Sequence, residues 1–330
     1  MISLGFVGLG LIGSRRLEFA RARPSCRVAF AIDPDLARRA AFALDGCHLA
    51  ATIDAFETIN DEFPDAVFVA VPHHEAAKAA RWALSRGAHV LCEKPLGLDL
   101  AEARSVAALA QAKGKKLCAG FNYRYLSGVQ ALRDLLRDRS LGTVYRVRMM
   151  MGHGGRPGME REWKLKKAHA GGGALIDPGI HLIDLARFFF GEARAASSLL
   201  RRRFWASDVE DFCAVSITCG NIDAAIEVSL TSWRNQFSIE VYGSEGMVRL
   251  EGRGGNYGTQ RLEFTNRWFW QDGADHRISR DLGKDDNSFF LETAAFLDWV
   301  EHGRYDGMMA TADDGCAALQ LVEELYAGAL

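Results

Sequence analysis

A glycine-rich segment near the N-terminus has the spacing of a dinucleotide-binding turn. It runs through Gly8, Leu9, Gly10, Leu11, Ile12 and Gly13, directly after a β-rich run and directly before a helical stretch. The first glycine permits a tight turn, the second lets the backbone approach a pyrophosphate, and the third lets the helix pack closely on the strand. The helix N-terminus then presents its N–H groups to the phosphates. The complete strand–turn–helix context favours an NAD(P) site over an ordinary turn.

Asp33 lies 20 residues beyond Gly13, at the end of the second expected strand. A carboxylate at this place accepts hydrogen bonds from ribose hydroxyls and repels a 2′-phosphate, so NAD is expected rather than NADP. Three arginines are near enough in sequence to keep NADP open: Arg15, Arg16 and Arg38.

Asp177 and His181 are four residues apart near the start of an expected helix, so we expect their side chains on one helix face. Histidine is suited to accept a proton at neutral pH while a nicotinamide takes a hydride, which together oxidise an alcohol. Other interpretations stay open: Asp177 as a helix cap, His181 as a core residue, or the pair as metal ligands. Because no third ligand with suitable spacing is evident, we expect no metal.

Short β-rich runs alternate with helical stretches over the first 120 residues. The expected strands are Ile2–Val7, Val28–Ile32, Ala66–Val71, His89–Cys92 and Lys116–Ala119. This alternation predicts an α/β fold, with a doubly wound parallel sheet of Rossmann type in residues 1–120. Residues 121–330 show strands separated by turn signals, followed by two helices. They are expected to form an α+β domain on an open, largely antiparallel sheet, for substrate binding and oligomerisation.

The composition is that of an ordinary globular protein. The 330 residues are 48% hydrophobic and 25% charged, with a formal net charge of −2, which argues against nucleic-acid and membrane partners. The longest apolar runs are far shorter than the roughly 18 residues of a membrane span. The seven cysteines are scattered without a CxxC pair, so we expect a reduced, cytoplasmic protein. The first residues indicate a strand rather than a signal peptide.

Several motifs together make the chain similar to the Gfo/Idh/MocA family of glucose–fructose oxidoreductases and inositol dehydrogenases. They are Glu93-Lys94-Pro95, the stretch GGGALIDPGIH at 171–181, Asn122-Tyr123-Arg124, and the turn YGSEG at 242–246. The resemblance spans essentially the whole chain. It implies nicotinamide-dependent chemistry on sugars, cyclitols or nucleotide-linked sugars. It also implies a catalytic trio of Lys94, Asp177 and His181, and a cis peptide bond at Lys94-Pro95.

The resemblance further implies cofactor contacts at the ends of the fourth and fifth strands, which here are Val71, Pro72, His73, Glu93 and Lys94. Many members have T-P-N-x-x-H after the fourth strand. This chain has His73 at the asparagine position and Ala76 at the histidine position. We therefore expect His73 to stand in for the missing polar group beside the nicotinamide.

Substrate contacts are expected from the trio and from the second domain. The residues assigned to them are Lys94, Asn122, Arg124, Arg156, Trp163, Asp177 and His181, with Tyr123, His153, Glu160 and Lys164 as further candidates. Trp163 is suited to stack on a sugar face. Several of these residues lie in a long glycine-rich loop, and solvated surface charges are the alternative interpretation of that loop.

Two other functions fit the same scaffold: a glycosidase that retains NAD, and a non-catalytic NAD-binding regulator. A regulator without catalytic activity would be expected to have lost the catalytic trio, but this chain retains Lys94, Asp177 and His181. An open sheet would expose alternating small and apolar residues on one face, so we expect a homodimer or homotetramer joined through the second-domain sheets.

Overall fold

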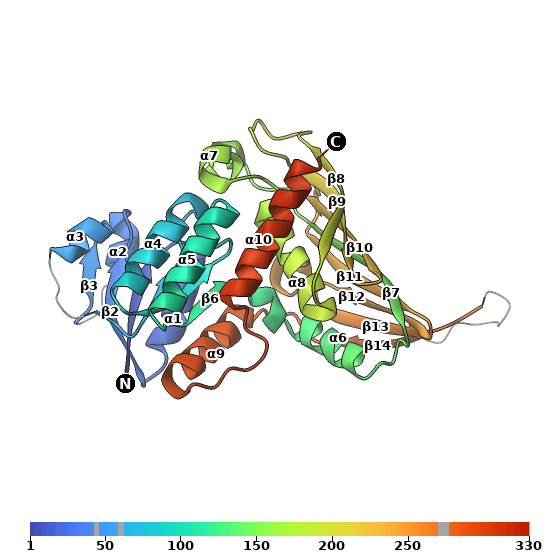
Figure 1. Ribbon diagram of the computed structural model, residues 1–330, viewed down its shortest axis with the longest axis horizontal. Helices are drawn as coiled ribbons and strands as arrows, with labels where there is room; N and C mark the ends of the chain where they lie inside the picture. The colour runs from blue at the N-terminus through green and yellow to red at the C-terminus, as the bar shows by residue number, and fades with distance from the viewer. Residues whose placement is uncertain (43–45, 59–62, 270–276, 330) are drawn as a thin grey trace. The chain divides into compact units, whose positions relative to one another are not determined.

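A parallel six-stranded sheet forms the N-terminal part of the computed structural model, which describes residues 1–42, 46–58, 63–269 and 277–329 (Figure 1). The strands are β1 (Ile2–Val7), β2 (Cys26–Ile32), β3 (His48–Ala50), β4 (Ala66–Val69), β5 (His89–Glu93) and β6 (Leu117–Gly120). Their order is β3-β2-β1-β4-β5-β6, with every neighbouring pair parallel. This confirms the expected Rossmann sheet and adds one short edge strand, β3. Strands β1, β4 and β6 are almost wholly buried, as in sheets covered on both faces.

Helices connect these strands in the βαβ manner. They are α1 (Leu11–Arg21), α2 (Leu36–Ala41), α3 (Ile53–Glu57), α4 (His73–Ser85) and α5 (Leu100–Ala112). Short polar side chains begin three of them: Asp35, Thr52 and Asp99 each accept a hydrogen bond from a backbone N–H in the first turn.

The C-terminal helix α9 (Ser288–His302) and the start of α10 (Ala312–Ala327) extend this first unit. By contacts, residues 1–121 and 289–317 form unit 1, and residues 122–288 with the end of the chain form unit 2. All of 121–330 was expected in the second domain, whereas residues 289–317 group with the Rossmann sheet. The reason is packing: the buried Phe296 ring lies 5.6 Å from that of Phe68, and Lys116 lies over Trp299 at 5.4 Å.

An eight-stranded sheet is the framework of unit 2. Its strands are β7 (Val144–Gly152), β8 (Arg194–Arg201), β9 (Phe212–Cys219), β10 (Ile222–Ser229), β11 (Gln236–Gly243), β12 (Gly246–Glu251), β13 (Arg261–Asn266) and β14 (Arg277–Asp281). The order is β14-β13-β12-β11-β7-β10-β9-β8. Among the strand pairs of this sheet that the structure describes, β7–β10 alone is parallel, which confirms the expected largely antiparallel sheet. Strands β13 and β14 were not among the expected elements.

Helices and short turns of unit 2 precede and cover this sheet. They are η1 (Asn122–Tyr125), α6 (Ser127–Arg137), η2 (Met159–Arg161), η3 (Trp163–Leu165), α7 (Lys167–Ala170), the π-helical turn η4 (Leu175–Gly179), α8 (Ile180–Phe190) and η5 (Gly255–Tyr257). Strand β9 alternates strictly between buried and half-buried residues, so the core lies on one face of the sheet. Among the described residues, no helix is both long and apolar enough to cross a membrane.

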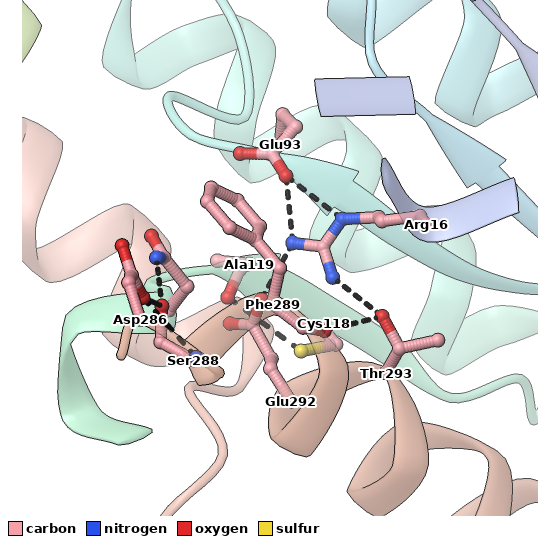
Figure 2. A network of polar contacts seen from close by, with 10 residues as sticks. Arg16, Glu93, Cys118, Ala119, Asp286, Ser288, Phe289, Glu292 and Thr293 are labelled. Atoms are coloured by element: carbon pink, nitrogen blue, oxygen red, sulfur yellow. Dashed lines mark hydrogen bonds and ion pairs between the residues drawn. The ribbon is translucent and has the colours of Figure 1, made fainter. Parts of the chain in front are cut away.

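A buried arginine joins three segments of unit 1. Figure 2 shows Arg16 of α1 between Glu93 at the end of β5 and Glu292 of α9. Its Nη2 lies 2.6 Å from Glu93 Oε1 and 2.5 Å from Glu292 Oε2, and its Nη1 donates to Thr293 Oγ1 at 3.0 Å. Burial lowers the pKa of Arg16, but the two carboxylates outweigh it and raise that pKa overall. Because its donors are engaged here, Arg16 is not placed to receive a 2′-phosphate.

We expect Arg16→Ala to lower the free energy of unfolding by about 3–5 kcal/mol, because it leaves two carboxylates without their buried partner. Arg16→Lys should recover little, since an ammonium group cannot replace the planar fork. Arg15→Ala is the matched control: this exposed neighbour lies over Phe289 at 5.6 Å, so its loss should cost no more than about 1 kcal/mol. Urea denaturation measures all three. Equal effects at positions 15 and 16 would contradict the buried network.

Candidate active site

The glycine-rich turn is shaped as a cradle for phosphate. Gly8 has a φ of +91°, and a Cβ there would lie 2.3 Å from a backbone carbonyl oxygen. A Cβ on Gly13 would lie 1.9 Å from the carbonyl oxygen of Gly8, so both positions require glycine. Helix α1 begins at Leu11 after Gly10, and no side chain caps it. Because no side chain caps the helix, the N–H groups of its first turn are left for an anion such as a pyrophosphate.

Asp33 is fixed at the carboxyl end of β2. It is buried; its Oδ2 accepts a hydrogen bond from the Leu9 N–H at 2.7 Å, and its Oδ1 accepts one from the Asp35 N–H at 2.9 Å. Arg38 lies beside it, with Nη1 3.6 Å from Asp33 Oδ2 and Nε 3.6 Å from Asp35 Oδ2. The carboxylate is therefore held next to the glycine-rich turn, with one half-exposed arginine at its side.

The expected nicotinamide-side residues lie at the ends of β4 and β5. Val71 packs against the turn, since a Cβ added to Gly8 would lie 3.1 Å from the existing Cγ1 of Val71. Pro72 precedes α4, and His73 is the buried first residue of that helix. The Lys94-Pro95 peptide is cis, as the resemblance implied. Since the strands are parallel, these residues and the glycine-rich turn share the carboxyl edge of the sheet, where ligands bind in doubly wound folds.

Asp177 and His181 do not share a helix face, and the expectation that they do was wrong. Helix α8 begins at Ile180, and Asp177 has the extended angles φ −143° and ψ 89° within η4. The cause is Pro178, whose ring disfavours the helical conformation for the residue before it. Asp177 is therefore oriented by its own local turn rather than by α8.

The charged partner of Asp177 is Lys164. Its Nζ lies 2.7 Å from Asp177 Oδ2. The charge of Asp177 raises the pKa of Lys164, against the effect of burial. The pKa of His153 is lowered, first by burial and then by the charge of Lys164, while Asp177 acts in the opposite direction. The Nδ1 atom of His153 also accepts a hydrogen bond from the Gly155 N–H at 3.0 Å. Lys164, Asp177 and His153 thus form one electrostatic cluster.

His181 is buried in an aromatic stack. Its ring lies 3.9 Å from the ring of Tyr123, at an interplanar angle of 10°. Arg253 lies over Tyr123 at 5.0 Å and over Tyr257 at 3.9 Å, and it pairs with Asp286 at 3.3 Å. Burial raises the pKa of the Tyr123 hydroxyl. Arg253 and Tyr257 were not among the expected site residues, because they are more than 70 residues from His181 and belong to no motif.

Asn122 and Arg124 are engaged in holding unit 2 together. Arg124 is buried, and its Nε and Nη2 donate to the Asp184 carboxylate at 2.9 and 2.6 Å. Asn122 is also buried, and its Nδ2 donates to Ser288 Oγ at 2.6 Å. These contacts favour a structural role for both residues over the expected substrate contacts.

The expected loop residues are nearer the surface. Arg156 is exposed and forms a two-pronged pair with Glu162, at 2.7 and 2.6 Å. Trp163 is half-buried, with the Lys164 ammonium 5.7 Å from its ring centre.

Glu210 positions the segment that carries Asp177 and His181. This buried carboxylate accepts hydrogen bonds from the Gly173 and Leu175 N–H groups at 3.1 and 2.9 Å, and from the Tyr326 hydroxyl at 2.7 Å. A Cβ on Gly173 would lie 1.9 Å from the Glu210 carbonyl oxygen, which explains a glycine there. Glu210 was not among the expected site residues, because no spacing relates it to the glycine triplet.

Comparison with known proteins places the chain in a family. Residues 2–121 match the oxidoreductase family with an NAD-binding Rossmann fold, and residues 129–249 match the GFO/IDH/MocA C-terminal domain. The chain is 27% identical to the rhizopine catabolism protein MocA of Rhizobium meliloti over 337 residues, covering 97% of this chain and 92% of that protein. It is 28% identical to the levoglucosan dehydrogenase of Pseudarthrobacter phenanthrenivorans over 213 residues, covering 60% of this chain and only 54% of that protein.

A solved structure agrees with these matches. GenD2 from gentamicin A biosynthesis, solved in complex with NAD, has a TM-score of 0.83 and 29% identity, and the match covers 99% of this chain and 93% of that one. The two family matches, the glycine cradle and the two sheets lead to one conclusion. The chain belongs to the GFO/IDH/MocA family and is an oxidoreductase with an NAD-binding Rossmann domain and the C-terminal domain of that family.

Proposed function

We propose that this oxidoreductase transfers a hydride between NAD and a hydroxyl or keto carbon of a sugar, a cyclitol or a nucleotide-linked sugar. The bound nicotinamide supplies the hydride acceptor in oxidation and the donor in reduction. The observation that carries the proposal is the stretch GGGALIDPGIH, which presents Asp177 and His181 from one segment held by Glu210. Relatives named levoglucosan dehydrogenase and inositol 2-dehydrogenase support a polyhydroxylated substrate.

Each member of the proposed trio has a distinct task. In oxidation, the imidazole of His181 accepts the proton of the reacting hydroxyl. Lys94 stabilises the negative charge that develops on that oxygen. Asp177 orients the substrate through a neighbouring hydroxyl, and its carboxylate pairs with Lys164. The pH dependence of kcat/KM then belongs to the coupled set rather than to His181 alone.

The cofactor choice rests on Asp33. We assign its carboxylate to accept hydrogen bonds from the ribose and to repel a 2′-phosphate, so NAD is the proposed preference; its fixed place beside the glycine-rich turn supports this. Arg38 at 3.6 Å supports a residual activity with NADP. The phosphates bind at the first turn of α1, between Gly8 and Gly13.

Replacing Asp33 with asparagine should narrow or invert the preference for NAD. Asparagine retains an oxygen for the Leu9 N–H but removes the charge that repels a 2′-phosphate, so the kcat/KM ratio of NAD to NADP should fall about tenfold or more. Arg38→Ala should shift the same ratio the opposite way. Steady-state kinetics with both cofactors gives the ratios. A higher kcat/KM with NADP in the unmodified enzyme would refute the role of Asp33.

His181→Ala should lower kcat by about 10²–10⁴-fold, the usual loss on removing a general base. NADH binding, followed by fluorescence, should stay normal because no phosphate or ribose contact is lost. The substrate comes from a panel of sugars, cyclitols and nucleotide sugars, followed at the absorbance of the reduced cofactor. Lys94→Ala should do similar damage and Lys94→Arg should not restore activity. His302→Ala, an exposed histidine, is the control. If His181→Ala retains more than about a third of kcat, the histidine is structural.

The open face of the unit 2 sheet supports a homodimer or homotetramer. Its hollow of about 490 Å³ is lined by small, apolar and charged side chains that include Ala214, Ser216, Ala225, Arg148 and Glu240. Some of the polar ones already pair with one another, as Arg148 does with Glu240 at 3.3 Å. Such a mixed face is suited to an interface between two copies of the chain.

Ala225→Arg should dissociate the oligomer, because the exposed Ala225 lies beside Arg148 in the sheet and a second guanidinium there adds bulk and like charge. Glu18→Arg on α1 is the control for added surface charge and should leave the assembly intact. Light scattering at micromolar concentration measures the mass. A species of 36.3 kDa for the unmodified protein would contradict the oligomer.

We also propose that the protein is located in the cytoplasm. All seven cysteines are free thiols, and three of them, Cys92, Cys118 and Cys213, are fully buried. Free thiols are typical of a reducing compartment.

A further inference from the structure

A cavity of about 660 Å³ lies at one edge of the unit 2 sheet. Strands β7 and β10 are parallel, and β12 has the same direction because both β7 and β12 are antiparallel to β11 (Figure 1). The carboxyl ends of these three strands therefore meet at one edge. The loops that follow them form the cavity walls, with Gly154 after β7, Trp233 to Asn235 after β10, and Asn256 to Gly258 after β12.

The cavity adjoins the candidate active site from two directions. His153 directly precedes Gly154 and belongs to the electrostatic cluster of Asp177 and Lys164. On the other side, the cavity residue Tyr257 is the last member of the stack that begins at His181. Its neighbouring members are separated by only 3.9, 5.0 and 3.9 Å. The cavity wall is therefore linked to the imidazole of His181 through two intervening side chains, Tyr123 and Arg253.

Trp233 gives the cavity an aromatic wall. Its side chain is 67% exposed, which is unusual for so large an apolar group. The indole is nevertheless held in place: Phe204 contacts it at 4.9 Å with an interplanar angle of 77°, and a Cβ on Gly154 would lie only 3.1 Å from its Cε3. The exposed ring is thus fixed where a flat-faced ring can stack on it.

Polar groups complete the lining. Asn235 Nδ2 donates to the Asn256 carbonyl oxygen at 3.2 Å and ties two of the loops together. Across the parts of the chain that the structure describes, the side chains of Arg234 and Asn256 have no hydrogen-bond partner, so their donors are available to a ligand. The eight lining residues include no carboxylate. This chemistry accepts a neutral or anionic group with a flat face.

We propose that this cavity is a second-ring subsite, so that the substrate is a sugar or cyclitol extended by a further ring. The added ring stacks on Trp233 and receives hydrogen bonds from Asn235 and Asn256. Two sources have this chemistry: a second sugar, and the base of a nucleoside diphosphate, whose phosphates would pair with Arg234. The inference rests on the proposed function, because it extends the same substrate.

The test compares each monosaccharide with its disaccharide and its UDP- and dTDP-linked forms, using the full chain with NAD. For at least one sugar, an extended form should have a kcat/KM at least about tenfold above the monosaccharide, and Trp233→Ala should remove that advantage. The monosaccharide itself should react equally well with the variant. Arg234→Ala should weaken only the nucleotide-linked forms. Tyr145→Ala, an exposed aromatic on the distant end of β7, is the control.

A binding measurement keeps this test independent of turnover. Titration of UDP and of the disaccharides into the His181→Ala variant, followed calorimetrically, should give affinities that Trp233→Ala lowers about tenfold or more. If extended ligands bind in a Trp233-dependent way but no sugar is turned over, the result would contradict the proposed reaction and support the subsite. Turnover of monosaccharides with no binding of any extended form, or an equal loss for all forms in Trp233→Ala, would overturn the subsite.

Discussion

The Rossmann unit depends on one buried guanidinium. Arg16 stands three residues beyond the last glycine of the phosphate turn, and its fork holds Glu93 and Glu292. A charge placed so deep in a protein requires partners, and their removal costs far more than the loss of a surface ion pair. Because Glu93 directly precedes Lys94, the same contact that secures α1 also fixes the end of β5. The phosphate cradle and the proposed reacting lysine are therefore parts of one rigid arrangement.

In unit 2, a buried carboxylate fixes the segment that carries Asp177 and His181. Glu210 receives backbone N–H groups from the glycine triplet and the hydroxyl of Tyr326. The segment then turns at Pro178, which forces Asp177 out of helical geometry before α8 begins. Its carboxylate meets Lys164 rather than sharing a helix face with His181. In each unit, a buried polar side chain that is not itself a proposed catalytic group holds the segment that carries such groups. Arg16 does so in unit 1 and Glu210 in unit 2.

The arrangement of unit 2 links chemistry with substrate size. Asp177 and Lys164 form an ion pair beside His153, whereas His181 lies in an aromatic stack that continues through Tyr123 and Arg253 to Tyr257. One end of this stack is the proposed proton acceptor, and the other is the wall of a cavity. Three strands of the same direction bring the loops of this cavity together, so the sheet topology positions the proposed second-ring subsite.

The sequence by itself determined the parts that depend on local spacing. The glycine pattern with Asp33, the alternation of strands and helices, and the two long motifs predicted the Rossmann sheet, the mostly antiparallel second sheet and the family. Local spacing could not predict contacts between distant segments. The partners of Arg16 are 77 and 276 residues away, and Glu210 follows the glycine triplet by 37. Even within a motif, helical periodicity misplaced Asp177, since one proline interrupted the period. Only the tertiary structure decided these pairings, because a buried charge selects its partner by position in space rather than by distance along the chain.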